Sequence, residues 1–174
     1  MGLQLVFVVE TNKKCKSDWI YIKDTIDCFY RYDQAQTKFS PVYMDGKGKY
    51  KSKEKEISNL VSQYASTSKT NETKIIYCFD CDDYDINQED SLFLKNARQY
   101  CLTKGYQFIW FCKDIERVYL GKQVDDSNKQ NESVTFKKKK LIAHVDIERL
   151  SFSDYRLNTS NIINVLDMYL TRKP

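Results

Sequence analysis

The chain has 174 residues and a mass of 20.6 kDa, with 41% hydrophobic and 30% charged residues. This is the length of one domain, and the composition excludes a disordered or collagen-like chain. The net charge of +4 is uneven: residues 1–72 carry +3, residues 73–126 carry −3 and residues 127–174 carry +4. An acidic centre between basic flanks is typical of a cation site beside a phosphate-binding surface, and equally of ordinary solvated faces.

The cysteines and the first apolar run indicate a cytoplasmic protein with free thiols. Residues 5–9 are apolar but have no basic leader, so a strand is expected there and not a signal peptide. No apolar run reaches the roughly 18 residues of a membrane span. A reducing cytoplasm keeps thiols unpaired. Of six cysteines only Cys78 and Cys81 are closely spaced, and without a second pair they do not predict a zinc site.

Strand and helix patterns alternate along the chain. Near-continuous apolar runs predict buried strands, and apolar residues at helical spacing predict amphipathic helices. The expected strands are residues 3–9, 39–44, 74–79 and 106–111. The expected helices are residues 17–31, 52–66, 88–103, 114–120 and 161–171. Pro41 favours the start of a strand or an edge of the sheet, and Gly105 favours the end of a helix.

Residues 121–140 interrupt this alternation. The segment is strongly polar and ends in a lysine run, which predicts a flexible basic loop. The run suits neutralisation of nucleic-acid phosphates, although a solvated surface has the same composition. It consists of Lys137, Lys138, Lys139 and Lys140. Residues 1–174 are therefore expected to form one α/β domain, a three-layer Rossmann-like fold with a mainly parallel sheet of about four strands flanked by helices.

Acidic residues follow two of the expected strands. Glu10 follows the first strand, and Asp80, Asp82 and Asp83 follow the third. Because parallel strands place their carboxyl ends at one edge of a sheet, we expect these side chains to lie close together. Carboxylate oxygens at this density suit Mg²⁺ or Mn²⁺, which polarise a phosphodiester and activate water. The alternative is a solvated acidic loop.

The chain resembles the Toprim domain of topoisomerases, primases and nucleases, and more closely the small RloB-like proteins linked to phage defence. The resemblance covers most of residues 4–120 and the last helix. It departs from the family at Thr11, where glycine is usual, and in lacking an Asn-Pro before the third motif. The matching motifs are Glu10 with Asp18-Trp19-Ile20-Tyr21, then Phe79-Asp80-Cys81-Asp82-Asp83, Phe111-Cys112-Lys113-Asp114-Ile115-Glu116 and Thr159-Ser160-Asn161-Ile162.

This resemblance implies a Toprim-like fold and a magnesium- or manganese-dependent nuclease that acts on DNA or RNA in phage defence. It assigns catalysis to Glu10, Asp80 and Asp82, which would hold the metal together with Asp83. Asp18 and Glu116 would support these residues, and the lysine run would hold the nucleic-acid backbone. Both supporting acids have an alternative interpretation as acids at helix N-termini.

Two other functions stay open at this stage. A non-catalytic α/β module that binds a partner protein or nucleic acid in a defence or mobile-element system is the main alternative, and Thr11 in place of glycine favours it. A receiver domain also uses acids at strand ends, but Glu10 lacks the adjacent acid that a receiver needs. Replacing Asp80 by asparagine separates the first two functions, because only an enzyme should lose activity.

Overall fold

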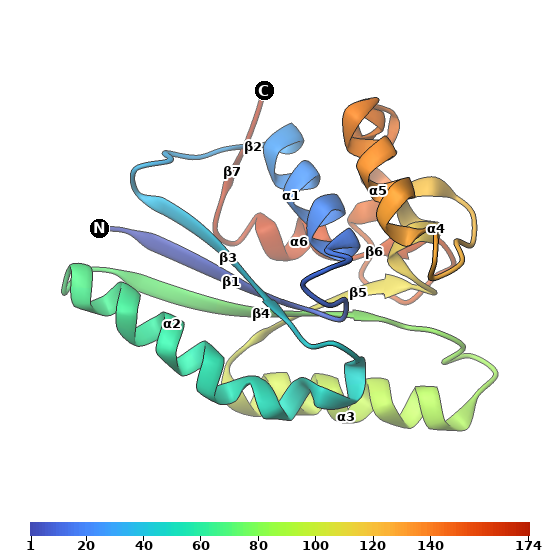
Figure 1. The fold of residues 1–174 in the computed structure, drawn as a ribbon, viewed down its shortest axis with the longest axis horizontal. Coiled ribbons are helices and arrows are strands. Elements are labelled where there is room, and N and C mark those ends of the chain that lie inside the picture. The colour runs from blue at the N-terminus through green and yellow to red at the C-terminus, as the bar shows by residue number, and fades with distance from the viewer.

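A central sheet lies between two layers of helices in the computed structural model, which describes residues 1–174 (Figure 1). The strands are β1 (Leu3–Val9), β3 (Thr37–Tyr43), β4 (Glu72–Asp80), β5 (Gln107–Cys112) and β6 (Thr159–Ser160). Their order in the sheet is β3-β1-β4-β5-β6; the first four are parallel, and β6 is antiparallel to β5. The predicted α/β fold with a mainly parallel sheet is confirmed, and β6 is a strand that the pattern did not predict.

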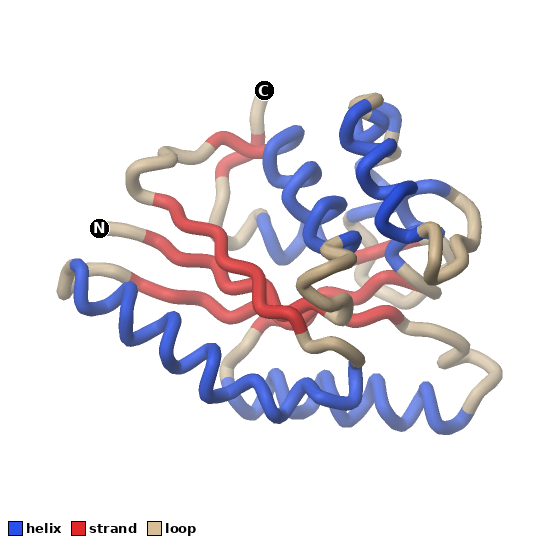
Figure 2. Tube along the Cα trace, in the orientation of Figure 1, coloured by secondary structure: helices blue, strands red, loops and turns tan.

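The helices divide between the two faces of the sheet (Figures 1 and 2). One face carries α1 (Ser17–Phe29), α4 (Ile115–Leu120), α5 (Lys129–Lys138) and α6 (Ile162–Leu166). The other carries the 3₁₀ helix η1 (Lys47–Lys53), α2 (Glu54–Thr67) and α3 (Gln88–Lys104). Two further 3₁₀ turns, η2 (Leu141–His144) and η3 (Ile147–Leu150), follow α5.

Burial of β1 on both faces explains its continuous apolar run. Leu5 and Phe7 point into the core beneath α1, whereas Val6 and Val8 point into the core beneath α2 and α3. All four side chains have no exposed surface. Because successive side chains of a strand point to opposite faces, alternate residues of β1 pack into the two hydrophobic cores.

The prediction of a flexible loop over residues 121–140 is wrong for residues 129–138, because they form α5, which packs against α1. Only Ser133 and Phe136 of this helix are buried. The Phe136 ring lies 5.0 Å from the ring of Tyr21 and 5.8 Å from that of Tyr119, measured between centroids. A single aromatic anchor produces no apolar periodicity, so the sequence pattern could not reveal this helix.

The last helix is shorter than the predicted residues 161–171, because α6 ends at Leu166. Asp167 accepts a hydrogen bond from the Tyr30 hydroxyl at 2.8 Å and forms an ion pair with Arg172. The strand β7 (Thr171–Arg172) then pairs with β2 (Tyr30–Arg31). The chain therefore leaves the helical path to attach its last residues to the end of α1.

The two edges of the sheet are closed in different ways. The outer strand β3 contains Pro41, as predicted, and a proline contributes no N–H to a neighbouring strand. At the other edge β6 is only two residues long, and the Asn161 side chain continues the ladder. Its oxygen accepts from the Trp110 N–H at 2.9 Å, and its nitrogen donates to the Phe108 carbonyl at 2.9 Å.

Replacing Asn161 by alanine is expected to lower the free energy of unfolding by about 2 kcal/mol, because two main-chain groups of β5 lose their partners. Urea denaturation measures this change. The matched control is Asn164→Ala, which removes exposed hydrogen bonds to Ser151 and Phe152. We expect the control to cost less than about 0.5 kcal/mol. Equal losses in both variants would show that the Asn161 amide does not support β5.

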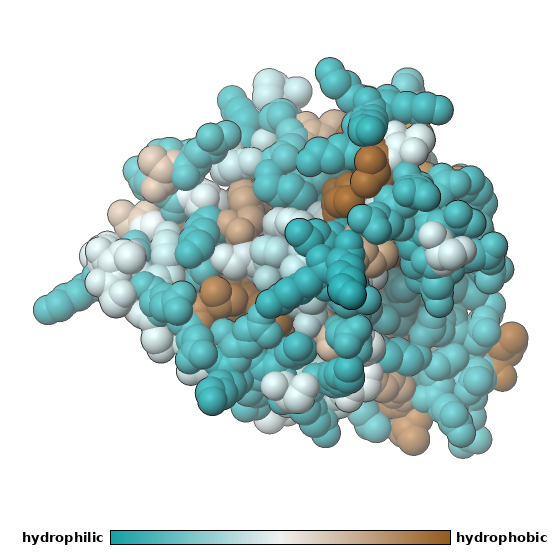
Figure 3. Space-filling view, in the orientation of Figure 1, coloured by the Kyte–Doolittle hydropathy of each residue, from teal (hydrophilic) through white to brown (hydrophobic).

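The face of the molecule drawn in Figure 3 is mainly hydrophilic, with small separate apolar areas. None of the helices combines the length and the apolar character required to cross a membrane. The exposed large apolar side chains are Met1, Ile86, Leu92, Leu102, Leu157 and Met168.

Candidate functional site

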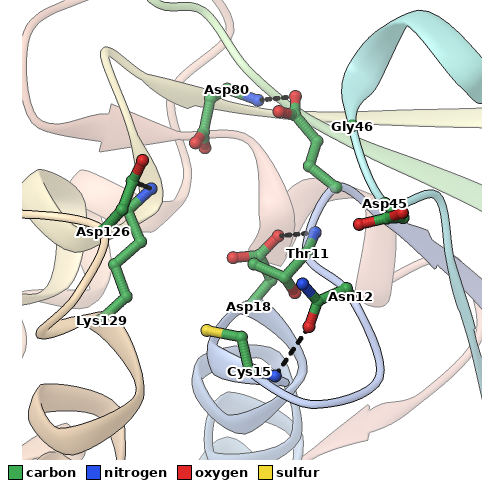
Figure 4. A pocket seen from close by; sticks show the side chains of 10 residues that line it. Thr11, Asn12, Cys15, Asp18, Asp45, Gly46, Asp80, Asp126 and Lys129 are labelled. Atoms are coloured by element: carbon green, nitrogen blue, oxygen red, sulfur yellow. Dashed lines mark hydrogen bonds and ion pairs between the residues drawn. The ribbon is translucent and has the colours of Figure 1, made fainter.

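A crevice opens at the carboxyl ends of β1 and β4, because the chain leaves these neighbouring strands in opposite directions. β1 leads to α1 on one face and β4 leads to α3 on the other. Such a divergence is where open α/β sheets bind ligands. A pocket of about 460 Å³ lies there (Figure 4). It is lined by Glu10, Thr11, Asn12, Cys15, Asp18, Asp45, Gly46, Asp80, Asp126 and Lys129.

Glu10 and Asp80 form the floor of the pocket and are oriented by main-chain N–H groups. The Asp80 N–H donates to Oε1 of Glu10 at 2.9 Å, and the Ile115 N–H donates to Oδ1 of Asp80 at 3.0 Å. The other oxygen of each carboxyl accepts no hydrogen bond from the protein. Each side chain is therefore fixed through one oxygen, while its second oxygen is available to a ligand.

Asp18 adds a third carboxyl, and Figure 4 shows it pointing into the pocket beside Thr11. It is 7% exposed, and its Oδ2 accepts from the Thr11 N–H at 3.2 Å. It does not cap α1, whose N-cap is Lys16 without a side-chain hydrogen bond. The buried hydroxyl of Thr11 has no partner. Asp18 therefore belongs to the pocket, and its alternative interpretation as a helix cap is not supported.

Glu116 lies behind the pocket in the first turn of α4 and is fully buried. Neither of its carboxyl oxygens accepts a hydrogen bond. The nearest cation is Lys129, whose Nζ lies 3.8 Å from Oε2 of Glu116. Capping of α4 is provided by Asp114, which accepts from the Arg117 N–H at 2.8 Å. A buried carboxyl without hydrogen bonds is costly, which marks Glu116 as part of the charged site.

Burial raises the pKa of these carboxyls. Burial and the nearby charge of Asp18 raise the pKa of Glu10 to about 8, and burial raises that of Glu116 to about 7. Burial shifts the pKa of Asp18 upward, and burial together with Glu10 does the same for Asp80. Burial opposes the charge of Lys129, but Glu116, Asp80 and Asp18 raise its pKa overall. The site thus places several carboxyls that retain protons more readily than usual around one ammonium group.

The raised pKa values predict that the protein, in a metal chelator, is more stable at pH 5.5 than at pH 8.5. The folded chain retains protons that the unfolded chain, with a carboxyl pKa near 4.5, has already released. This stabilisation is complete below the unfolded pKa and is lost as the pH rises through 7 to 8. We expect a difference of about 3 kcal/mol in urea denaturation. The Glu10→Gln variant should show a smaller difference, and equal stability at both pH values would contradict the prediction.

The other two predicted metal ligands lie outside the pocket. Asp82 has a left-handed backbone, with φ of 49°, and its carboxylate pairs with Lys47, which also binds Asp90 at 2.9 Å. Asp83 forms an ion pair with Lys113 at 2.9 Å. The structure therefore brings together Glu10 and Asp80 but not the full predicted set. No three His, Cys, Asp or Glu side chains are arranged as a group that could hold a metal ion.

Lys129 is the basic residue of the pocket, and sequence reasoning missed it. It is the first residue of α5, a helix that the sequence pattern did not reveal. The predicted run at residues 137–140 is exposed but lies at the opposite end of this helix. Ten helical residues extend about 15 Å, so the run is remote from the acids. The cation closest to the candidate site is therefore Lys129.

Comparison with known proteins adds no relative. No family model matches this chain, and no curated protein or solved structure matches it. The likeness to Toprim and RloB-like proteins consequently rests on short motifs. The functional argument depends on the fold and on the geometry of the pocket.

Proposed function

We propose that the protein is a Toprim-like, metal-dependent enzyme that acts on nucleic-acid phosphodiesters, as a nuclease of RloB-like type in phage defence. The observation that carries the proposal is the meeting of Glu10 and Asp80 in the crevice between β1 and β4. Buried carboxyls with raised pKa values repel one another, and a bound cation relieves that repulsion. The pocket lining contains more acidic than basic side chains, which also supports a bound cation.

Glu10 and Asp80 fit Mg²⁺ or Mn²⁺ by the chemistry of their donors. Each offers one carboxylate oxygen that is free of protein hydrogen bonds, while its other oxygen is held by a main-chain N–H. Mg²⁺ characteristically uses one or two carboxylates and completes its shell with water and substrate phosphate. Two ligands are therefore sufficient, although no three-residue group is present. Asp82 would join them only by leaving Lys47.

The pocket residues have separate roles in this mechanism. A divalent cation, when bound, supplies positive charge to the scissile phosphate and lowers the pKa of water. Asp80 would hold the cation through its free carboxylate oxygen, while the hydrogen bond from the Ile115 N–H to Oδ1 fixes the orientation of its side chain. Glu10 would hold the cation together with Asp80, through the carboxylate oxygen that accepts no hydrogen bond from the protein. Asp18 fixes the loop after β1 through the Thr11 N–H.

Calorimetric titration of Mg²⁺ and Mn²⁺ into the wild-type protein and into Glu10→Gln tests the metal site. We expect binding to wild type and loss of binding in the variant, because the glutamine removes the charge but keeps the shape. A labelled single-stranded DNA or RNA should then be cleaved with Mg²⁺ and not with a chelator. Absence of both binding and cleavage in the wild-type protein would overturn the proposal.

The exposed lysine run favours a second candidate, a non-catalytic module that binds nucleic acid or a partner protein. Lys137, Lys138, Lys139 and Lys140 are exposed, and none of them forms an ion pair. Replacing all four by alanine would abolish the function of such a module, which Glu10→Gln would leave intact. The opposite pattern favours the enzyme.

A further inference from the structure

We propose that Lys129 binds a phosphate group of the substrate inside the pocket. This inference rests on the proposed function and names a residue that would contact the phosphodiester in the same pocket as Glu10 and Asp80. Figure 4 shows Lys129 and Asp126 on one side of the pocket, and Asp18 and Asp80 facing the same space.

Two ion pairs hold the ammonium of Lys129 in place, but it donates no hydrogen bond to the protein. Its Nζ lies 3.4 Å from Oδ1 of Asp126 and 3.8 Å from Oε2 of Glu116. Both distances exceed those of N–H···O hydrogen bonds, and Lys129 makes none with the protein. Its side chain is 23% exposed and lines the pocket. The ammonium therefore has N–H donors without hydrogen-bond acceptors at the wall of a pocket that a ligand can enter.

The other lysines near this edge of the sheet are already engaged. Lys47 donates to Asp82 and Asp90, and Lys113 donates to Asp83 at 2.9 Å. A lysine with satisfied donors must break an ion pair before it binds an anion. Lys129 also has ion-pair partners, at 3.4 and 3.8 Å, but it donates no hydrogen bond to them. An incoming phosphate oxygen therefore adds hydrogen bonds without removing any.

Glu116 explains why Lys129 stays in this position. Its carboxyl is fully buried, has no hydrogen bond, and has Lys129 as its nearest cation. Moving the ammonium away would leave this buried charge unpaired, which is strongly unfavourable. Glu116 is therefore a positioning residue that keeps a cation at the pocket wall while its N–H donors remain available.

A phosphodiester is the ligand chemistry that fits this arrangement. A cation bound by Glu10 and Asp80 and the ammonium of Lys129 would lie on two sides of the pocket, and a tetrahedral phosphate has oxygens for both. Nucleic-acid phosphate and free phosphate share this chemistry, so the experiment must separate them.

The test compares Lys129→Met with Lys95→Met, which removes an exposed lysine of α3 on the other face of the sheet that has no ion pair. Fluorescence anisotropy of a labelled 12-nucleotide single strand is measured with Ca²⁺ in place of Mg²⁺. We expect Lys129→Met to weaken binding about tenfold and Lys95→Met to weaken it less than about twofold. Lys129→Arg, which keeps the charge, should retain most of the affinity. Wild-type affinity in Lys129→Met would overturn the proposal.

Two further measurements distinguish nucleic-acid phosphate from free phosphate, and distinguish failure of the metal proposal from failure of the Lys129 contact. Competition by inorganic phosphate alone, with no binding of the strand, would overturn the nucleic-acid assignment. Calorimetry should show that Lys129→Met still binds Mg²⁺, and more tightly, since a like charge has gone. If wild type binds no Mg²⁺ but Lys129→Met still weakens strand binding, the metal proposal fails and the phosphate contact stands.

Loss of the ammonium leaves Glu116 unpaired, so folding must be controlled separately. The double variant Glu116→Gln/Lys129→Met removes both charges and should melt like the wild-type protein. It should bind the strand as weakly as Lys129→Met. Glu116→Gln alone should bind with an affinity between those of wild type and Lys129→Met, because its lysine has lost its anchor. Wild-type affinity in a folded double variant would overturn the proposal.

Discussion

Replacing Asp80 by asparagine is expected to reduce metal-dependent cleavage at least about 1,000-fold, because the free carboxylate oxygen loses its charge while the side chain keeps its shape. The amide oxygen of asparagine can still accept the hydrogen bond from Ile115, which lies 3.0 Å away in the native protein. The loop between β5 and α4 should therefore stay in place. Initial rates on a labelled oligonucleotide measure the effect.

Asp83→Asn is the matched control for this prediction. Asp83 belongs to the same acidic motif, but its carboxylate is exposed and pairs with Lys113. We expect its rate to remain within about threefold of wild type, since surface ion pairs contribute little. Because burial raises the pKa of Asp80, the Asp80→Asn protein should be at least as stable as wild type at pH 8. Cleavage at the wild-type rate by a folded Asp80→Asn protein would remove Asp80 from the mechanism.

Phe136→Ala is expected to lower the free energy of unfolding by about 3 to 4 kcal/mol. The phenyl ring is 1% exposed and packs edge-on against the stacked rings of Tyr21 and Tyr119. No other large apolar side chain of α5 is fully buried, so the cavity removes the main attachment of this helix. Urea denaturation measures this loss. The control Thr135→Ala, at an exposed neighbouring position, should change the free energy of unfolding by less than about 0.5 kcal/mol.

Undocking of α5 would have a local consequence as well as a global one. Residues 121–140 of Phe136→Ala should be cut by a protease under conditions in which the wild-type helix resists. Since Lys129 begins α5, binding of a nucleic-acid strand should weaken in the same variant. A variant that loses less than about 1 kcal/mol and stays resistant would show that other contacts hold the helix.

The elements of the sheet were the most predictable part of the fold. Residues 3–9 were expected as a strand and form β1 with the same bounds, because a segment buried on both faces must be apolar throughout. The shortened α6 was not predictable. Its end depends on Asp167 meeting Tyr30, which lies 137 residues away in the chain, and no local pattern contains that contact.

The candidate site was predictable to the extent that it follows from strand order. Glu10 and Asp80 meet because parallel neighbours place their ends together, which spacing and polarity already indicated. The direction of the Asp82 side chain was not predictable, since it depends on an ion pair with Lys47, which belongs to the segment that follows β3. Lys129 was missed because its helix is attached by one buried aromatic side chain.

The closed edges of the sheet have a consequence for assembly. Strands with free N–H and C=O groups recruit strands from other molecules, which leads to fibres and domain exchange. Here Pro41 lies within the outer strand β3, and Asn161 occupies the hydrogen-bonding groups of β5 beyond the short β6. Growth of the sheet by strand addition is thereby disfavoured at both ends. The Asn161→Ala protein, which reopens one end, should form thioflavin-positive aggregates sooner than wild type at the same concentration.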